Sequence, residues 1–226
     1  WGASISCLFA ALAVGLFYVD EGTGAPAPRR DPAAPSLAAP GSFFTALVFV
    51  VFFVNFASRS FTPILPAQLE SFGVAPSSLA FSTGVLISVY SIAAAVSSFG
   101  FGRLAAGIDP VRLIGLSLFL SLLAALAMAH AATFGAFLGV ALVYGLVSGG
   151  GLTLGYSIGS RRFPEASRGA SFGRLSGAAL IGGAVAPAIA AFVARSALVD
   201  VYWMNALIYA ILIGTAVTLL RAPVRA

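Results

Sequence analysis

Seven apolar runs, each about the length that a helix needs to cross a lipid bilayer, dominate this sequence. A transmembrane helix requires about 20 predominantly apolar residues. Such runs cover residues 1–19, 43–65, 78–99, 111–131, 134–158, 170–194 and 202–220. Short polar or Pro/Gly-rich connections separate most of them, as is typical of neighbouring helices in a compact bundle. We therefore predict an all-α integral membrane protein with seven transmembrane helices.

The scarcity of charge indicates the same class. Only 8% of the residues are charged and 60% are hydrophobic, whereas about 25% charged residues are usual in a soluble chain. All 12 basic residues are Arg and the formal net charge is +5, but no continuous basic face of the kind that reads nucleic acid is present. We expect the protein to contact the lipid bilayer and no nucleic acid.

One connection is much longer than the others. Residues 20–42 are rich in Pro, Ala and Gly, a composition that favours an extended linker over a helix. This linker separates a first span at 1–19 from a six-helix segment at 43–226. Six helices built as two three-helix units of inverted topology are a recurrent half of secondary transporters, and the sequence is compatible with that arrangement.

The positions of the Arg residues give the orientation, because short cytoplasmic loops collect basic residues. With the linker in the cytoplasm, ten of the 12 Arg fall on the cytoplasmic side, Arg195 falls on the opposite side, and Arg59 lies within a span. This bias predicts a multi-pass protein of the plasma or inner membrane whose linker and C-terminus are cytoplasmic.

Arg59 is the most informative single residue. It lies seventeen residues after Ser42, which corresponds to roughly 25 Å of helix and places it in the outer part of a core about 30 Å thick. An unpaired guanidinium facing lipid is costly. Two interpretations follow: an Arg that lines a central aqueous path and binds substrate, or an Arg that reaches the outer interface because Pro63 and Pro66 end the helix nearby.

Other polar side chains within the spans complete a candidate substrate cavity. Asn55 lies four residues before Arg59, on the same helical face, and Tyr90, Tyr144 and Tyr209 each lie within an apolar run. We predict that these five residues contact a small-molecule substrate. The alternative for each of them is a hydrogen bond between packed helices.

Glycines are dense in the runs at 134–158 and 170–194. Small residues at four-residue spacing let membrane helices approach closely, and Gly177, Gly182, Gly183 and Pro187 lie in the second of these runs. We expect these four residues either to pack against a neighbouring helix or to form a point where the helix bends between outward-open and inward-open states.

The sequence offers no candidate residues for catalysis, metal binding or an intramembrane proton relay. All seven acidic residues lie in loops or at helix boundaries, and the single histidine, His130, lies at a helix end, whereas a proton relay usually needs an intramembrane acid or histidine. We expect no enzyme activity, no cofactor and no metal site. Any coupling proton is expected to bind in a part of the protein outside this chain.

These observations are also compatible with a second class of membrane protein. The absence of Lys excludes a retinal protein, which needs a Lys for its Schiff base. A complete seven-helix membrane receptor or sensor without retinal is the alternative to a transporter.

Residues 102–112, GRLAAGIDPVR, resemble the cytoplasmic loop motif of the major facilitator superfamily. Gly102 matches the first glycine of that motif and Arg103 follows it, whereas Ala106 stands where the family has Asp. Asp109 replaces the second glycine, and Arg112 supplies the later positive charge. This is the form expected in the second half of such a transporter.

Two further segments resemble drug-exporter-like members of the same family. Residues 61–66 (FTPILP) with 78–90 are similar to the first helix pair of a half, and 160–187 is similar to a later loop and its Gly-rich helix. Ala186 replaces the Gly that precedes Pro187 in the antiporter signature.

The resemblance implies the domain organisation and the function. Residues 1–19 would be the last helix of an incomplete N-terminal half, residues 20–42 the central cytoplasmic linker, and residues 43–226 the C-terminal half. The rest of the N-terminal half would then be a partner missing from this chain. The implied activity is secondary active transport of a small organic solute by alternating access, in the direction of efflux.

Overall fold

The computed structural model describes residues 41–221, which all lie in one compact unit. The span predicted at 1–19 and nearly all of the linker lie outside the described residues. Regular structure in the described part is entirely helical, in this order: α2 Gly41–Ser60, η1 Thr62–Ile64, α3 Leu65–Ser71, α4 Pro76–Gly107, α5 Pro110–Ala129, α6 Phe134–Ser148, α7 Gly150–Arg162, η2 Glu165–Ser167, α8 Arg168–Val193 and α9 Val199–Arg221.

These helices form six segments that are long and apolar enough to cross a membrane. The first runs through α2, η1 and α3, the fourth runs through α6 and α7, and α4, α5, α8 and α9 each form one. They correspond to the six predicted spans within the described residues. The prediction of an all-α membrane bundle is therefore confirmed.

The connection between the second and third segments is shorter than predicted. α4 continues to Gly107, so Gly102 and Arg103 lie in its last turns and not in a loop. Pro110 begins α5 and disfavours helical backbone in the residue before it, which leaves Ile108 and Asp109 as the whole connection. The Asp109 carboxylate caps α5 by accepting a hydrogen bond from the Val111 N–H at 3.1 Å.

α6 ends and α7 begins at Gly149, whose backbone stays helical (φ −59°, ψ −29°) and whose N–H donates to the Gly145 carbonyl at 3.1 Å. Hydroxyl groups of neighbouring helices also donate to carbonyls here: Ser117 of α5 to Val147 at 2.6 Å, and Ser98 of α4 to Gly149 at 2.7 Å. The run at 134–158 was predicted as one span, and α6 with α7 forms one membrane-length segment.

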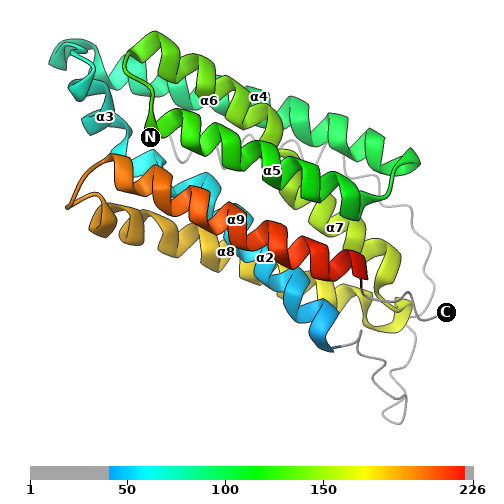
Figure 1. Cartoon of the computed structure of the whole chain (residues 1–226). Helices are drawn as coiled ribbons and strands as arrows, with labels where there is room; N and C mark the ends of the chain where they lie inside the picture. Colours follow the sequence, from blue (N-terminus) through cyan, green and yellow to red (C-terminus); the bar gives the residue numbers. More distant parts are fainter. Residues whose placement is uncertain (1–40, 222–226) are drawn as a thin grey trace, which may run out of the picture. The chain divides into compact units, whose positions relative to one another are not determined.

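The six segments form two three-helix units that pack reciprocally. The first unit is α2–α3, α4 and α5, and the second is α6–α7, α8 and α9. The first helix of each unit packs on the second helix of the other (α2 on α8, and α6–α7 on α4), and the third helices α5 and α9 pack on each other. In Figure 1, α2, α8 and α9 lie side by side, as do α4, α5 and α6. Because the two units begin at opposite ends of the bundle, this is the pattern of an inverted repeat.

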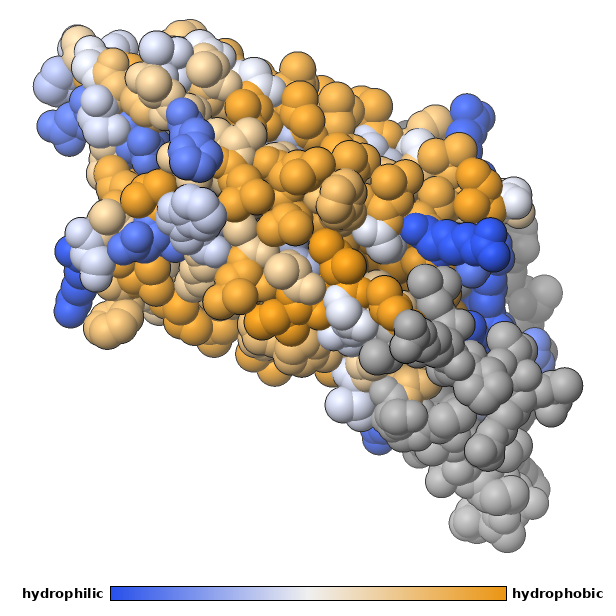
Figure 2. All heavy atoms as spheres, viewed as in Figure 1, coloured by the Kyte–Doolittle hydropathy of each residue, from blue (hydrophilic) through white to orange (hydrophobic). Residues whose placement is uncertain are grey.

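Apart from Arg59, the charged residues of the described part lie at the two ends of the bundle. Figure 2 shows a broad apolar band in its middle, with strongly polar residues at both ends. Arg residues gather at the end where α4 and α7 finish and where α5 and α8 begin: Arg103, Arg112, Arg161, Arg162, Arg168 and Arg174. Arg195 lies at the opposite end, between α8 and α9. The described residues therefore show the segregation on which the orientation was predicted.

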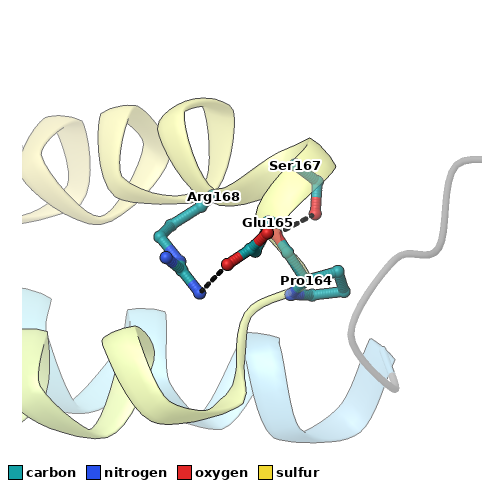
Figure 3. Close-up of polar contacts among 4 residues, drawn as sticks. All are labelled: Pro164, Glu165, Ser167 and Arg168. Atoms are coloured by element: carbon teal, nitrogen blue, oxygen red, sulfur yellow. Dashed lines mark hydrogen bonds and ion pairs between the residues drawn. The ribbon is translucent and has the colours of Figure 1, made fainter.

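The connection between α7 and α8 is a tight turn at the Arg-rich end (Figure 3). The Ser167 hydroxyl donates to the Pro164 carbonyl at 3.5 Å, and Arg168 forms an ion pair with Glu165 at 3.9 Å. The Glu165 side chain is 90% exposed, so solvent screens the pair and its contribution to stability is small.

Two of the six segments bury little of their surface inside the unit. The apolar windows of α4 and α8 are only 11% and 22% buried, against 44–50% for the other four segments. Large apolar side chains on both helices are exposed, including Phe81, Ile92, Phe99, Leu180 and Phe192. Lipid or further protein can cover such surfaces in a membrane.

Candidate functional site

A cavity of about 260 Å³ lies among α2, α4 and the α6–α7 junction. Its volume is near the lower end of small-molecule pockets, which are roughly 300–1,000 Å³. Three of the five predicted substrate-cavity residues line it, namely Arg59, Asn55 and Tyr90. The other lining residues are Val54, Ser58, Ser91, Ala94, Ala95, Ser98, Ser148, Gly149 and Leu152.

The cavity lies near the middle of the segments that form it. Tyr90 is close to the centre of α4, and Ser148 and Gly149 are close to the centre of the α6–α7 segment. Binding sites of secondary transporters lie at this depth, at the interface between repeats.

Arg59 lies deeper in its span than its predicted place in the outer part. Pro63 and Pro66 do not end the segment, since η1 and α3 carry it on to Ser71. Within Phe43–Ser71, Arg59 is therefore about 24 Å of helical rise from one end and about 18 Å from the other. The structure places it on the cavity and not at the end of its span. Its exposure reflects open space in the cavity.

The polar groups around Arg59 are largely occupied by backbone carbonyls. The Asn55 amide donates to the Ala179 carbonyl of α8, which fixes Asn55 between two helices. The Ser58 hydroxyl donates to the Val54 carbonyl at 2.8 Å, and the Ser148 hydroxyl donates to the Tyr144 carbonyl at 2.7 Å. Within residues 41–221, no hydrogen bond or ion pair reaches the Arg59 guanidinium.

Tyr144 and Tyr209 lie behind the cavity wall. Both side chains are 1% exposed, and their hydroxyl groups are 2.7 Å apart. The Tyr144 ring stacks on the Tyr90 ring with 5.7 Å between centroids, and Phe61 packs edge-on against both. In this structure the pair supports the cavity residue Tyr90 through helix–helix contacts. Contact of either residue with a substrate stays a prediction.

The glycine pair of α8 closely approaches α2. A Cβ atom added at Gly182 would collide with the Phe52 carbonyl group, and one added at Gly183 would lie 2.8 Å from Asn55 Nδ2 and 3.5 Å from Arg59 Cγ. Nothing lies within 4 Å of such an atom at Gly177. Pro187 lies inside the continuous helix α8. Close packing at Gly182 and Gly183 is thus visible, whereas bending at Pro187 stays a prediction.

A corresponding approach joins the α6–α7 junction to α4. A Cβ atom added at Gly145 would lie 2.6 Å from the Tyr90 carbonyl oxygen, and one added at Gly149 would collide with the backbone of Ala94. These contacts explain why the cavity wall has glycines where α6 and α7 meet.

The motif residues lie at the Arg-rich end, away from the cavity. Gly102 is in α4, where the nearest neighbour of an added Cβ is the Thr153 methyl group at 3.7 Å, and the Arg103 guanidinium lies 4.6 Å from the centre of the Phe99 ring. Arg112 is exposed in the first turn of α5. Arg161 of α7 donates to the Ala105 carbonyl near the end of α4, a contact that the motif alone did not predict.

Sequence reasoning named neither Ser148 nor Gly149 as cavity residues. Ser148 lies four residues after Tyr144, on the same helical face, and this spacing was the available signal. Within the described residues, no group of three or more His, Cys, Asp or Glu side chains is placed to hold a metal ion.

Comparison with known families decides the class of protein. A sequence model of the Major Facilitator Superfamily matches residues 47–226. The chain belongs to this superfamily. Its members are membrane transporters and not enzymes, and the six membrane-length helices agree with a multi-pass membrane protein. The alternative of a seven-helix receptor or sensor is wrong.

One curated relative is similar over part of the chain. Multidrug resistance protein MdtG of Proteus mirabilis (strain HI4320) is 33% identical over 121 residues, which are 50% of this chain and 30% of that protein. The chain thus matches under a third of the relative's length.

Proposed function

We propose that this chain is the C-terminal half of an exporter that moves small organic solutes by alternating access. The observation that carries the proposal is the cavity at mid-span, which combines one guanidinium with hydroxyl groups and apolar side chains. Similarity to a multidrug resistance protein favours export of organic compounds over uptake of a nutrient.

The arrangement of the helices supports a second half that completes the cavity. α4 and α8 bury the smallest share of their apolar windows, 11% and 22%. α8 packs on α2, which carries Arg59 and Asn55, and α4 lines the same cavity as these two residues. In this proposal the N-terminal half covers these exposed faces and closes the cavity. Residues 1–19 are its last helix and residues 20–42 the central linker.

Alternating access needs helices that can change their relative positions without losing contact. The reciprocal packing of two inverted units supplies two related arrangements of this kind. At Gly145, Gly149 and Gly182 the helices that border the cavity touch backbone to backbone, so no side chain interlocks there to oppose sliding of one helix past the other. A coupling proton, if the transport uses one, binds in the N-terminal half.

The export activity is tested with the full-length protein in a bacterial host that lacks its main exporters. Expression should lower the accumulation of organic compounds and raise the concentration needed to inhibit growth. Arg59→Ala, matched for expression, should abolish this effect. Unchanged accumulation on expression of the wild-type protein would contradict export, and unchanged export by the variant would contradict the role of Arg59.

The orientation is tested by labelling single cysteines in a full-length protein whose native cysteines, Cys7 among them, are replaced by Ser. The proposal places the linker and the C-terminus in the cytoplasm of a cell whose plasma or inner membrane holds the protein. A membrane-impermeant reagent added outside should then label a cysteine at Ser196 and not one at Ala27. The reverse pattern would overturn the orientation.

A further inference from the structure

Among the described residues, the lining of the cavity carries one positive charge and no negative charge. Arg59 lines it and is exposed to it, whereas the acidic residues of the described part lie at the ends of the segments: Glu70, Asp109, Glu165 and Asp200. None of the residues that line the cavity is acidic. A guanidinium at this depth has a high free-energy cost unless it is hydrated or paired. A ligand with a negative charge should therefore bind here with a more favourable free energy than a neutral one.

The hydrogen-bond inventory points in the same direction. Ser58, Ser98 and Ser148 each donate their one hydroxyl hydrogen to a backbone carbonyl, and Asn55 donates one of its two amide N–H groups to the Ala179 carbonyl. Arg59 offers five N–H donors in a fixed planar fork, and none of them is used within residues 41–221. Tyr90, Ser91 and the second Asn55 N–H add neutral donors, but Arg59 is the one charged donor among the residues that line the cavity, which suits an anionic ligand that accepts hydrogen bonds.

Apolar side chains form another part of the cavity surface. Val54, Ala94, Ala95 and Leu152 contribute aliphatic side chains, and the Tyr90 ring presents an aromatic face. We propose that the cavity binds small amphipathic organic anions, whose oxyanion group pairs with the Arg59 guanidinium and whose apolar part packs against these side chains. The transport of such anions rests on the function proposed above, whereas their binding does not.

The geometry of the guanidinium explains the choice of an oxyanion. Two parallel N–H donors match the two oxygens of a carboxylate, and this bidentate pairing is stronger and more directional than the contact of a Lys ammonium. Gly183 of α8 leaves space for the stem of Arg59, because a Cβ atom added there would lie 3.5 Å from Arg59 Cγ.

The experiment measures binding to the purified full-length protein by isothermal titration calorimetry. Three probes share a 3-phenylpropyl group and differ in the charge of the head group: 4-phenylbutanoate, 4-phenylbutanamide and 3-phenylpropyltrimethylammonium. The carboxylate should bind at least tenfold more tightly than the amide, and the cation should bind more weakly than both. Arg59→Gln should lower the affinity for the carboxylate at least tenfold and leave that for the amide within about twofold.

Two further variants separate charge, geometry and folding. Arg59→Lys keeps the charge and loses the fork, so its affinity for the carboxylate should lie between those of the wild type and Arg59→Gln. Arg195→Gln removes a charge at the end of the bundle and should bind all three probes as the wild type does. Arg59→Gln should unfold at the same temperature as the wild type or higher, since it removes a charge from mid-span.

The failure of this proposal is distinguishable from the failure of export. Equal affinity of Arg59→Gln and the wild type for the carboxylate overturns the proposal, as does preference for the cation, which would show that an acidic group elsewhere in the protein pairs with Arg59. Export of cations in the cellular assay would then leave the exporter function standing. Anion binding that depends on Arg59 without export in cells would support the proposal and contradict the exporter function.

Discussion

Replacing Gly145 with Ala tests the close approach of α6 to α4. The added Cβ would lie 2.6 Å from the Tyr90 carbonyl oxygen and 2.8 Å from Ala93 Cβ, whereas ordinary contact begins at 3.4 Å. The two helices must therefore separate locally by about 0.6–0.8 Å, and overpacking of this kind costs about 1–3 kcal/mol. The substitution of Gly by Ala within a helix returns about 0.5–1 kcal/mol. We expect a net loss of about 1–2 kcal/mol in the free energy of unfolding.

Gly139→Ala is the matched control, because Gly139 lies on the same helix and nothing lies within 4 Å of an added Cβ there. It should stabilise the protein by about 0.5–1 kcal/mol. Thermal unfolding of the full-length protein in detergent, followed by circular dichroism, should show a melting temperature about 2–8 °C lower for Gly145→Ala and slightly higher for Gly139→Ala. Equal melting temperatures of the two variants would refute the close packing of α6 on α4.

Two other substitutions test the neighbourhood of the cavity. Gly183→Ala would place a methyl group 2.8 Å from Asn55 Nδ2, so it should weaken ligand binding several-fold in a calorimetric titration, whereas Gly177→Ala on the same helix should not; equal affinities would contradict the role of this contact. Tyr209→Phe leaves the buried Tyr144 hydroxyl without its partner and should cost about 1–3 kcal/mol. The double variant with Tyr144→Phe should recover part of that loss in a melting experiment, and a larger loss in the double variant would argue against the pair.

The spans could be predicted from the sequence because hydrophobic length is a local property. A bilayer requires about 20 apolar residues whatever the neighbouring helices are, and the six runs between 43 and 220 all became membrane-length helices. The continuation of the first span past Pro63 and Pro66 could not be predicted in this way. Proline removes a backbone donor, but here the chain adopts a 3-10 turn and resumes as α3, which preserves the span.

The candidate site was predicted in part. Arg59 and Asn55 were identified because a charged or amide side chain in a membrane span has a high free-energy cost unless it is paired or hydrated. Both line the cavity together with Tyr90. The burial of Tyr144 and Tyr209 depends on how α6 and α9 are rotated, which a single sequence does not specify. The same applies to Gly149, whose place in the cavity depends on the close approach of this segment to Ala94 of α4.

The position of Arg59 also links ligand binding to closure of the transporter. A closed and dry cavity without ligand would leave the guanidinium unpaired in a medium of low dielectric constant, which costs several kcal/mol. A bound anion removes most of that cost, so the loaded protein should close and reorient more readily than the empty one. In proteoliposomes, exchange of labelled 4-phenylbutanoate against unlabelled 4-phenylbutanoate should therefore run faster than its net flux. Equal rates would show that the empty protein reorients freely and that Arg59 finds its counter-charge within the protein.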